Sequence, residues 1–393
     1  MSAAWPTVTL GEVIDHRKEF IIIDELETYR RPRVQLHAQG IVLRDAVPGA
    51  EIKTKKQQVA RAGEFLVAEI DAKVGGFGIV PDELDGSIVS SHYFLYGHRP
   101  DCLDNRYLGW FAKTRAFREQ VEAQGSTNYA AIRPNDVLGY AIPLPPLDEQ
   151  RRIVARIEEL AAKVEEARAT RQNSERELVA FGNSYANAAF ESANYQTRPL
   201  SDVCVIITDG THQTPRYVDG GAIFLSAQNV KPFRFMPKVH RKISHEDFAG
   251  YTARNKPMRG DVLLTRVGAG IGEAAVVDQD IDFAIYVSLA LIRPDTTVLT
   301  PEYMVQWSNS PIGRACSRAN TLGKGPSQGN LNLNLLRSFP IPIPSLDEQC
   351  HIVAELNALQ LKLDSVKVLQ SETAAELDAM LPAILDRAFK GEL

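Results

Sequence analysis

The sequence predicts an α+β fold in which two similar mixed α/β domains are separated by two long helices that form an intramolecular antiparallel coiled coil. Three observations support this prediction: a repeated proline-rich segment, an apolar heptad pattern after each copy, and a globular stretch before each copy. We expect domains at 1–145 and 193–343, and helices at 146–192 and 344–393. A chain of 393 residues is too long for one ordinary hydrophobic core, so more than one domain is expected.

The two globular regions share a few landmarks. Gly-Glu-Phe-Leu at 63–66 resembles Gly-Asp-Val-Leu at 260–263, and Tyr107 matches Tyr303 on a late amphipathic segment. Short apolar runs joined by loops rich in Gly, Pro and Asp are typical of strands. Because the regions share little other sequence, we expect one recognition fold used twice with different surfaces.

A repeat connects the globular regions to the helices. Ile-Pro-Leu-Pro-Pro-Leu-Asp-Glu-Gln at 142–150 recurs as Ile-Pro-Ile-Pro-Ser-Leu-Asp-Glu-Gln at 341–349, an offset of 199 residues. After each copy, apolar residues recur at alternating steps of four and three, which is the period of a coiled-coil seam. Beyond the seam, Phe190 matches Phe389. The expected seam comprises Ile153, Ile157, Leu160, Val164, Leu178 and Phe181 in the first helix, and Ile352, Leu356, Leu359, Leu363, Val366, Leu377 and Met380 in the second.

Proline and capping residues predict where the helices begin and end. Ser345 and Glu348 fit a capping box, whereas Pro146 has no side chain to cap with, so Asp148 is expected to start the first helix. Pro382 is expected to kink or end the second helix. Roughly 35 residues at about 1.5 Å each give a helix of about 50 Å, longer than one turn of B-DNA at about 34 Å. That length suits a spacer.

The distribution of charge bears on nucleic-acid binding more than the net value of −5 does. Lys and Arg outnumber Asp and Glu by 16 to 12 in residues 193–343, but are outnumbered by 9 to 4 in residues 344–393. The last segment is therefore a poor candidate for contact with phosphates, while 193–343 is a plausible one.

Location and metal content follow from what the sequence lacks. Residues 1–13 contain no basic run followed by an apolar stretch, and no run of about eighteen apolar residues occurs, so the cytoplasm is the expected location and no membrane contact is expected. The four cysteines are widely separated without metal-ligand spacing, so we expect reduced thiols and no metal.

Polar and basic clusters supply the candidate DNA-binding residues. Basic side chains suit phosphates, Arg pairs bidentately with guanine, and Asn and Gln pair with adenine. The alternative for each cluster is an ordinary solvated surface or turn. In the first region the candidates are Tyr29, Arg30, Arg31, Arg33, Gln35, His37, Lys53, Lys55, Lys56, Gln57, Ser126, Thr127 and Asn128. In the second region they are Asp209, Gly210, Thr211, His212, Thr214, Arg216, Tyr217, Gln228, Asn229, Lys231, Lys324 and Gln328.

Catalytic motifs are not recognised in the sequence. Val-Gly-Ala-Gly-Ile-Gly at 267–272 fits neither dinucleotide-binding nor P-loop spacing, and Asp-Ala-Lys at 71–73 lacks the upstream acid of a metal nuclease. Two further classes remain open: a single-chain nuclease with duplicated domains, which would need paired acids in both halves, and a protein-binding scaffold that has no contact with DNA.

The whole chain resembles the specificity subunits of type I restriction-modification systems. The resemblance rests on the two Pro-rich segments ending in Leu-Asp-Glu-Gln at 147–150 and 346–349, and on Asp-Gly-Thr-His at 209–212. It implies two target recognition domains, each reading one half of a split asymmetric site in double-stranded DNA. It also implies two methyltransferase subunits and two restriction subunits as partners. The chain itself would be non-catalytic and hold no cofactor, with S-adenosylmethionine, ATP and Mg²⁺ belonging to those partners.

Overall fold

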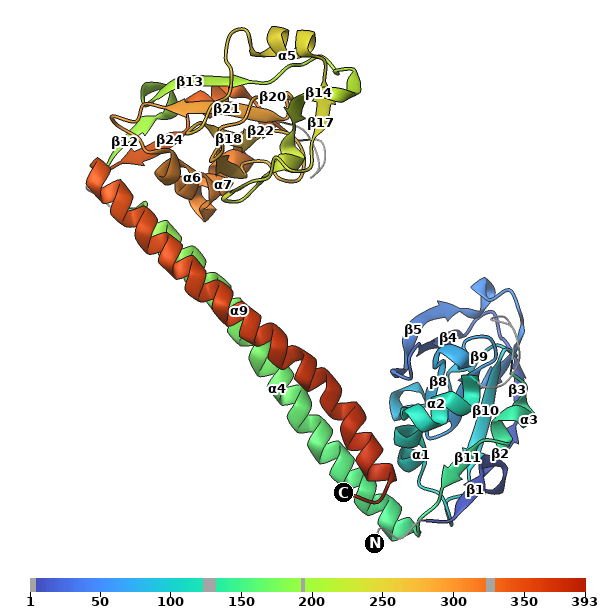
Figure 1. Ribbon diagram of the computed structural model, residues 1–393. Coiled ribbons are helices and arrows are strands. Elements are labelled where there is room, and N and C mark those ends of the chain that lie inside the picture. The colour runs from blue at the N-terminus through green and yellow to red at the C-terminus, as the bar shows by residue number, and fades with distance from the viewer. Residues whose placement is uncertain (1–4, 123–131, 192–194, 323–328) are drawn as a thin grey trace. The chain divides into compact units, whose positions relative to one another are not determined.

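The computed structural model describes residues 5–122, 132–191, 195–322 and 329–393 (Figure 1). It divides into two compact units, one made of Met1–Arg171 with Ser371–Leu393 and the other of Gln172–Gln370. Each unit contains one globular domain together with a part of both long helices. The two units are described separately.

A four-stranded antiparallel sheet forms the centre of each domain. In the first domain the strand order is β2 (Ile14–Arg17), β10 (Tyr93–His98), β7 (Phe65–Ala68) and β8 (Phe77–Ile79). In the second the order is β13 (Cys204–Asp209), β21 (Leu289–Pro294), β18 (Val262–Thr265) and β19 (Ala274–Val276). The two sheets have the same topology, because the corresponding strands occur in the same order along the chain and across the sheet.

Matching elements surround the two sheets. A two-stranded ribbon closes each domain, β1 (Thr7–Thr9) with β11 (Ala141–Pro143) and β12 (Gln196–Pro199) with β24 (Pro340–Ile343). Three helices follow the sheet in the first domain: α1 (Asn105–Ala112), α2 (Arg115–Glu122) and α3 (Pro134–Leu138). Their counterparts in the second domain are α6 (Pro301–Asn309), α7 (Pro311–Ala319) and α8 (Leu333–Arg337). This confirms the prediction of a mixed α/β fold used twice.

The domains differ in the segment of chain that connects the first two strands of the sheet, β2 to β7 in the first domain and β13 to β18 in the second. In the first domain it contains β3 (Phe20–Ile22), the hairpin of β4 (Thr28–Gln35) and β5 (Gly40–Pro48), and β6 (Lys56–Val59), which also pairs with β9 (Ile88–Val89). In the second it contains β14 (Tyr217–Leu225), β15 (Val230–Lys231), β16 (Arg234–Phe235), β17 (Arg241–Ile243) and α5 (His245–Thr252). There β14 pairs in parallel with β20 (Phe283–Ile285), and later β22 (Thr321–Leu322) pairs with β23 (Asn330–Leu331).

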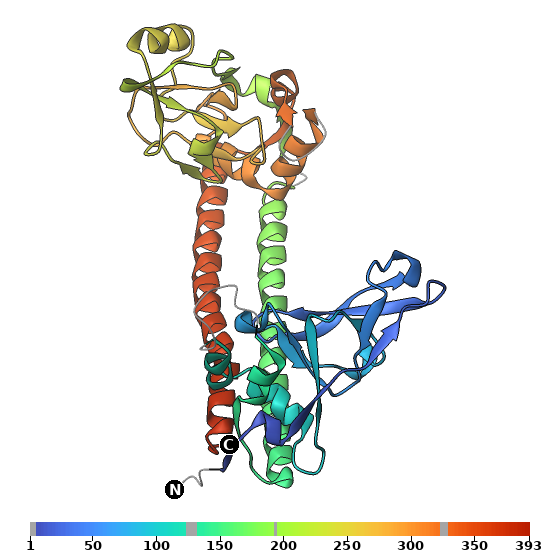
Figure 2. The same ribbon diagram turned by 90° about the vertical axis from the view of Figure 1, so that its right-hand side faces the viewer.

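The long helices α4 (Leu147–Ala188) and α9 (Leu346–Phe389) lie side by side within each unit (Figures 1 and 2). In the first unit Arg168 pairs with Asp378 at 2.9 Å, and Arg152 donates to the carbonyl of Leu393 at 2.8 Å. In the second unit the Tyr185 hydroxyl lies 3.3 Å from the Glu355 carboxylate. The first unit therefore joins the first part of α4 to the last part of α9 and the residues just beyond it, and the second unit joins the end of α4 to the start of α9. The two helices run antiparallel, as expected.

Several helix predictions need correction. Helix α4 begins at Leu147, so Asp148 lies inside the helix and does not start it. The Pro146 carbonyl accepts the first backbone hydrogen bonds of the helix, from the Glu149 amide at 2.9 Å and the Gln150 amide at 3.0 Å. Ser345 does cap α9, accepting the Glu348 amide at 3.3 Å. Helix α9 continues past Pro382 to Phe389, so of the two expected alternatives, a kink or an end, the proline does not end the helix. The helices contain 42 and 44 residues, which is fewer than the expected segments 146–192 and 344–393 allow but more than the roughly 35 residues used in the length estimate.

Burial varies along the expected seam. Five positions are buried, four of them within the hydrophobic cores of the domains, and six others are half-buried. The buried positions are Ile153, Ile157, Val164, Ile352 and Leu356, and the half-buried ones are Leu160, Leu178, Leu359, Leu363, Val366 and Leu377. Phe181 and Met380 are exposed instead. On α4 it is Gly182, next to Phe181, that faces Leu363.

The Gln that ends each Leu-Asp-Glu-Gln motif fastens a long helix to its domain. Gln150 is fully buried; its amide oxygen accepts from the Asp104 amide at 2.9 Å and its nitrogen donates to the Cys102 and Pro145 carbonyls at 2.8 Å. Gln349 makes the same contacts with Thr300, Val298 and Pro344 in the second unit. The motif is therefore a structural joint.

Candidate nucleic-acid interface

The candidate residues of the first domain lie on its inserted segment. Figure 2 shows the β4–β5 hairpin, in blue, extending from the rest of the domain. At the tip of the hairpin, the amides of His37 and Ala38 donate to the carbonyls of Val74 and Gly75 at 2.7 and 2.9 Å. This fixes the hairpin against the loop that follows β7. Gln35 lies half-buried beside the tip, and the His37 side chain is exposed.

Only some of the basic side chains here are available for a ligand. Arg33 and Lys53 are exposed, and no ion pair involves either among the described residues. Arg31 instead forms a two-bond pair with Asp45 on the opposite strand, at 2.7 and 2.8 Å. The hydrogen bonds from Arg31 lower the pKa of Asp45, and those to Asp45 raise the pKa of Arg31. Arg30 donates to the carbonyls of Glu83 and Asp85.

The remaining candidates of the first insert support its structure. Lys55 pairs with Glu25 at 2.9 Å, and the Lys56 amine lies 4.6 Å from the centre of the Phe20 ring. Tyr29 is half-buried, and its hydroxyl accepts from the Asp24 amide at 3.0 Å. Gln57 is buried and donates to the Thr54 carbonyl at 2.6 Å, so its expected role in reading a base does not fit its position.

In the second domain the loop after β13 is held against the β20–β21 turn. The Thr211 amide donates to the Ile285 carbonyl, and the Val287 amide donates to the Thr211 carbonyl, both at 3.0 Å. A Cβ at Gly210 would lie 2.0 Å from the Ile285 carbonyl oxygen, so only glycine permits this approach. His212, Thr214 and Arg216 follow on the exposed side of the loop.

The remaining candidates of the second domain include exposed side chains, which a ligand could contact, and a buried one, which supports the fold. Tyr217 is exposed, and the Arg241 guanidinium lies 4.6 Å from the centre of its ring. Gln228 is exposed, and the Lys231 amine lies 4.0 Å from the Glu273 carboxylate. Asn229 is buried and bonds the Met236 and Val239 carbonyls and the Ser226 amide, so it supports the turn and the base-reading role expected for it is not favoured.

Five candidates lie outside the described residues: Ser126, Thr127, Asn128, Lys324 and Gln328.

Sequence reasoning missed Arg266, which follows β18 and is buried. It donates to the Leu331 carbonyl at 2.9 Å, to the Val287 carbonyl at 3.3 Å, and to the Asp209 carboxylate. It thereby ties the 209–217 loop to two other segments. A lone arginine after an apolar strand gave no signal in the sequence, because its partners are distant along the chain.

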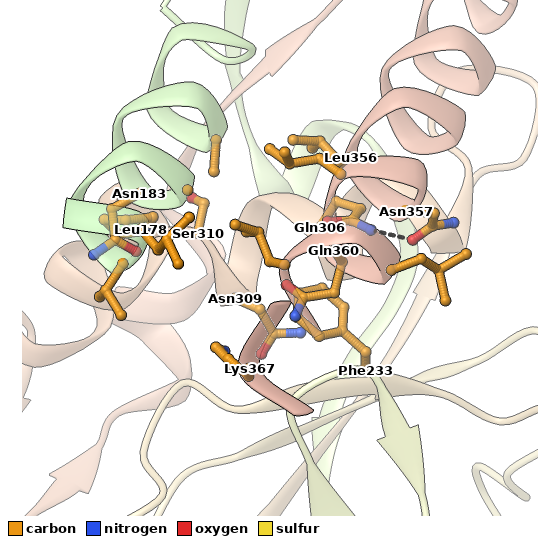
Figure 3. Close-up of a pocket in the computed structure, with 17 residues that line it drawn as sticks. Leu178, Asn183, Phe233, Gln306, Asn309, Ser310, Leu356, Asn357, Gln360 and Lys367 are labelled. Carbon is orange, nitrogen blue, oxygen red and sulfur yellow. Dashed lines mark hydrogen bonds between the residues drawn. The ribbon is translucent and has the colours of Figure 1, made fainter. Parts of the chain in front are cut away.

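A groove in the second unit has a different chemistry. It has a volume of about 420 Å³ and lies between the ends of α6 and α7 and the two long helices (Figure 3). Its walls are mainly apolar side chains such as Leu178 and Leu356, with Gln306 donating to Asn357 at 2.7 Å and Lys367 at one side. This lining does not suit a phosphate backbone.

Neither a metal site nor a membrane span is found in the described parts of the chain. No group of three or more His, Cys, Asp or Glu residues there is arranged to hold a metal ion. No helix there combines the length and the apolar character that crossing a bilayer requires.

Comparison with known families identifies the duplicated architecture. The profile of the type I restriction modification DNA specificity domain matches residues 3–173 and again residues 193–372. The chain belongs to this family. Two consecutive specificity domains account for the repeated sheet, ribbon and long helix.

Individual members of the specificity-domain family are distant from this chain. It is 28% identical over 280 residues to the type I restriction enzyme EcoBI specificity subunit of Escherichia coli, a match covering 64% of this chain and 58% of that subunit. It is 22% identical over 312 residues to the EcoKI specificity subunit of E. coli strain K12, covering 73% and 65% respectively. The match therefore spans less than two thirds of either relative.

Solved structures agree on the specificity-domain fold. One, described as the structural basis of complex assembly and conformational transition of the type I R-M system, has a TM-score of 0.78 and 24% identity, covering 100% of this chain and 99% of that one. The HsdS subunit of Thermoanaerobacter tengcongensis has a TM-score of 0.64 and 24% identity, covering 100% and 98%.

Proposed function

We propose that the chain is a non-catalytic, sequence-specific DNA-binding subunit of a type I restriction-modification complex. Each of its two domains reads one half of a split asymmetric site. The relatives named EcoBI and EcoKI are specificity subunits, and membership of their family supports the same role here.

One observation supports the DNA-reading role most directly. The two domains share a four-stranded sheet of identical topology, yet they differ in the segment that connects β2 to β7 in one domain and β13 to β18 in the other. The free basic and polar candidates lie on or beside that variable segment, including Arg33 and Lys53 in one domain and Arg216 in the other. A constant scaffold with variable polar loops suits two readers of different sequences.

Catalysis and cofactors are assigned to separate subunits in this proposal. Two methyltransferase subunits supply adenine methylation with S-adenosylmethionine, and two restriction subunits supply ATP- and Mg²⁺-dependent translocation and cleavage. The complex acts in the cytoplasm. A solved relative described in terms of type I complex assembly supports the existence of such partners. A duplicated nuclease is not favoured, because both halves of the chain match the specificity-domain family.

The proposal is tested by mobility shift with mixed duplex DNA, using the chain alone and with its methyltransferase subunit at low and moderate salt. We expect weak, salt-sensitive binding by the chain alone and tight sequence-specific binding with the subunit. Absence of binding in both states at every salt concentration would leave a scaffold as the better interpretation.

A domain exchange makes the test specific to one half. Replacing residues 1–145 by the first domain of another family member should change one half-site and leave the other intact. Methylome sequencing of cells that carry the complete system reads out both half-sites together. A change in both half-sites would contradict independent reading by the two domains.

A further inference from the structure

An exposed imidazole in the first domain is held by a carboxylate. Nδ1 of His92 lies 2.6 Å from Oε2 of Glu69, and 68% of the His92 side chain is exposed. Glu69 directly follows β7, and its amide donates to the His92 carbonyl at 2.9 Å. This backbone hydrogen bond holds the two residues next to each other independently of their side chains.

The second domain contains the same kind of pair. Nε2 of His212 lies 3.0 Å from Oδ2 of Asp209, and 72% of the His212 side chain is exposed. Asp209 is itself held by the buried Arg266. The neighbouring Thr211 is bonded through its backbone to the β20–β21 turn. The loop that carries the His212 imidazole is therefore also fixed by hydrogen bonds to the rest of the domain.

Both pairs lie at the same edge of the repeated sheet. Glu69 and Arg266 occupy equivalent positions, one residue beyond β7 and β18. The Glu69 amide donates to the carbonyl of the residue before β10, and the Arg266 amide donates to that of Ser288, the residue before β21. Their carbonyls accept from Ile132 and Leu331 at 3.2 and 2.9 Å. At this position one domain places the carboxylate itself, and the other places the arginine that holds it.

The carboxylate decides which ring nitrogen of each histidine donates a hydrogen bond and which can accept one. A carboxylate only accepts hydrogen bonds, so the ring nitrogen that faces it carries the hydrogen. In the neutral ring the other nitrogen is then an acceptor: Nε2 in His92 and Nδ1 in His212. In the major groove the matching donors are the exocyclic amino groups of adenine and cytosine. Holding the ring in place lowers the entropy lost when it binds a base.

We propose that His92 and His212 are specificity-determining residues, one in each domain, each accepting a hydrogen bond from an exocyclic amino group of its own half-site. His92 stood outside the candidates drawn from the sequence. The proposal rests on the proposed function. It means that both domains read a base with a histidine held by a carboxylate, although their inserted segments differ.

The test uses His92→Phe and His212→Phe, which keep a flat ring and remove both nitrogens. Each variant, as the full chain with its methyltransferase subunit, is offered duplexes randomised one position at a time within both half-sites. We expect discrimination to fall about ten-fold at one base position of one half-site, with the other half-site unchanged. The two variants should affect opposite half-sites. Glu69→Leu, which frees the His92 ring, should weaken discrimination at the His92 position alone.

His351→Phe is the matched control. His351 on α9 is 63% exposed and lies 3.3 Å from the Glu355 carboxylate, but it belongs to a long helix and not to the sheet edge. It should leave every base preference unchanged. The inference would be overturned if the wild-type protein discriminates between bases and both His92→Phe and His212→Phe discriminate equally well. Uniform loss of affinity with a smaller salt slope would also overturn it, since that indicates a phosphate contact. Wild-type protein without any discrimination would instead refute the proposed function.

Discussion

The ring of Phe389 packs against that of Tyr107, with centroids 5.0 Å apart, at the end of α9 in the first unit. The second unit repeats this contact between Phe190 and Tyr303, at 5.4 Å. Both tyrosines also donate to a ribbon carbonyl, of Pro143 at 2.8 Å and Pro342 at 3.0 Å. Each domain is thereby fastened both to the helix that follows it and to the end of the other helix.

Removing one of these rings should loosen one unit at a time. Phe190 is 5% exposed, so Phe190→Ala is expected to destabilise the second unit by about 3 kcal/mol, through lost burial and the cavity left behind. Hydrogen exchange should rise in the β12–β24 ribbon and in α6. Protection in the β1–β11 ribbon should stay at the wild-type level, and a uniform rise across both units would contradict separate fastening.

Gln150 offers a test of the joint formed by the Leu-Asp-Glu-Gln motif. Gln150→Met keeps the side-chain length but leaves the Asp104 amide and two carbonyls without their buried partner. Each unsatisfied buried group costs about 1–3 kcal/mol, so a clear drop in the melting temperature of the first unit is expected. Gln349→Met should do the same in the second unit, and exposed Gln228→Met serves as the control. Equal melting of the Gln150 and Gln228 variants would argue against the joint.

Arg33 and Arg30 should differ in their effect on DNA binding. Arg33 is exposed and in no ion pair among the described residues, whereas Arg30 is committed to two backbone carbonyls. Arg33→Ala is expected to weaken binding equally for all sequences and to reduce the salt slope by about 1. Arg30→Ala should instead lower stability with little change in slope. Fluorescence anisotropy over a salt series separates the two, and an unchanged slope for Arg33→Ala would remove it from the interface.

The Arg31–Asp45 pair should make the β4–β5 hairpin sensitive to acid. The pKa of Asp45 is lowered in the folded chain, chiefly by hydrogen bonds from Arg31. The carboxylate therefore contributes stability above its unfolded pKa of about 3.9, and this contribution is lost as the pH falls through the lower folded pKa. Asp45→Asn should destabilise the hairpin at pH 6 and match wild type at the acid end of the range. Hairpin exchange rates measured across that range check it; a difference that grows on acidification would contradict the assignment.

The spacer helices should set the gap between half-sites. Inserting four residues, about one helical turn, into both α4 and α9 is expected to change the tolerated gap while both half-sites stay the same. Methylome sequencing measures gap and half-sites together. An insertion into α4 alone is the control, because it breaks the pairing with α9 and should abolish specific methylation. An unchanged gap after the double insertion would show that the helices do not act as a spacer.

The sequence by itself determined the duplicated architecture, because periodicity and repetition are local properties of the chain. The 199-residue offset, the heptad spacing and the matched Tyr107 and Tyr303 were enough to predict two domains and an antiparallel helix pair. Local rules were less reliable at the helix ends: α4 begins at Leu147 without Asp148 as its cap, and Pro382 does not end α9.

Only the tertiary structure decided which polar side chains are available. Gln57 and Asn229 resemble base readers in the sequence but are buried, and Arg31 is paired with a residue on another strand. Arg266 and His92 carried no signal, since their partners are far along the chain or approach only when strands align. Exposure and pairing depend on contacts between distant residues, and the composition of a segment does not contain that information.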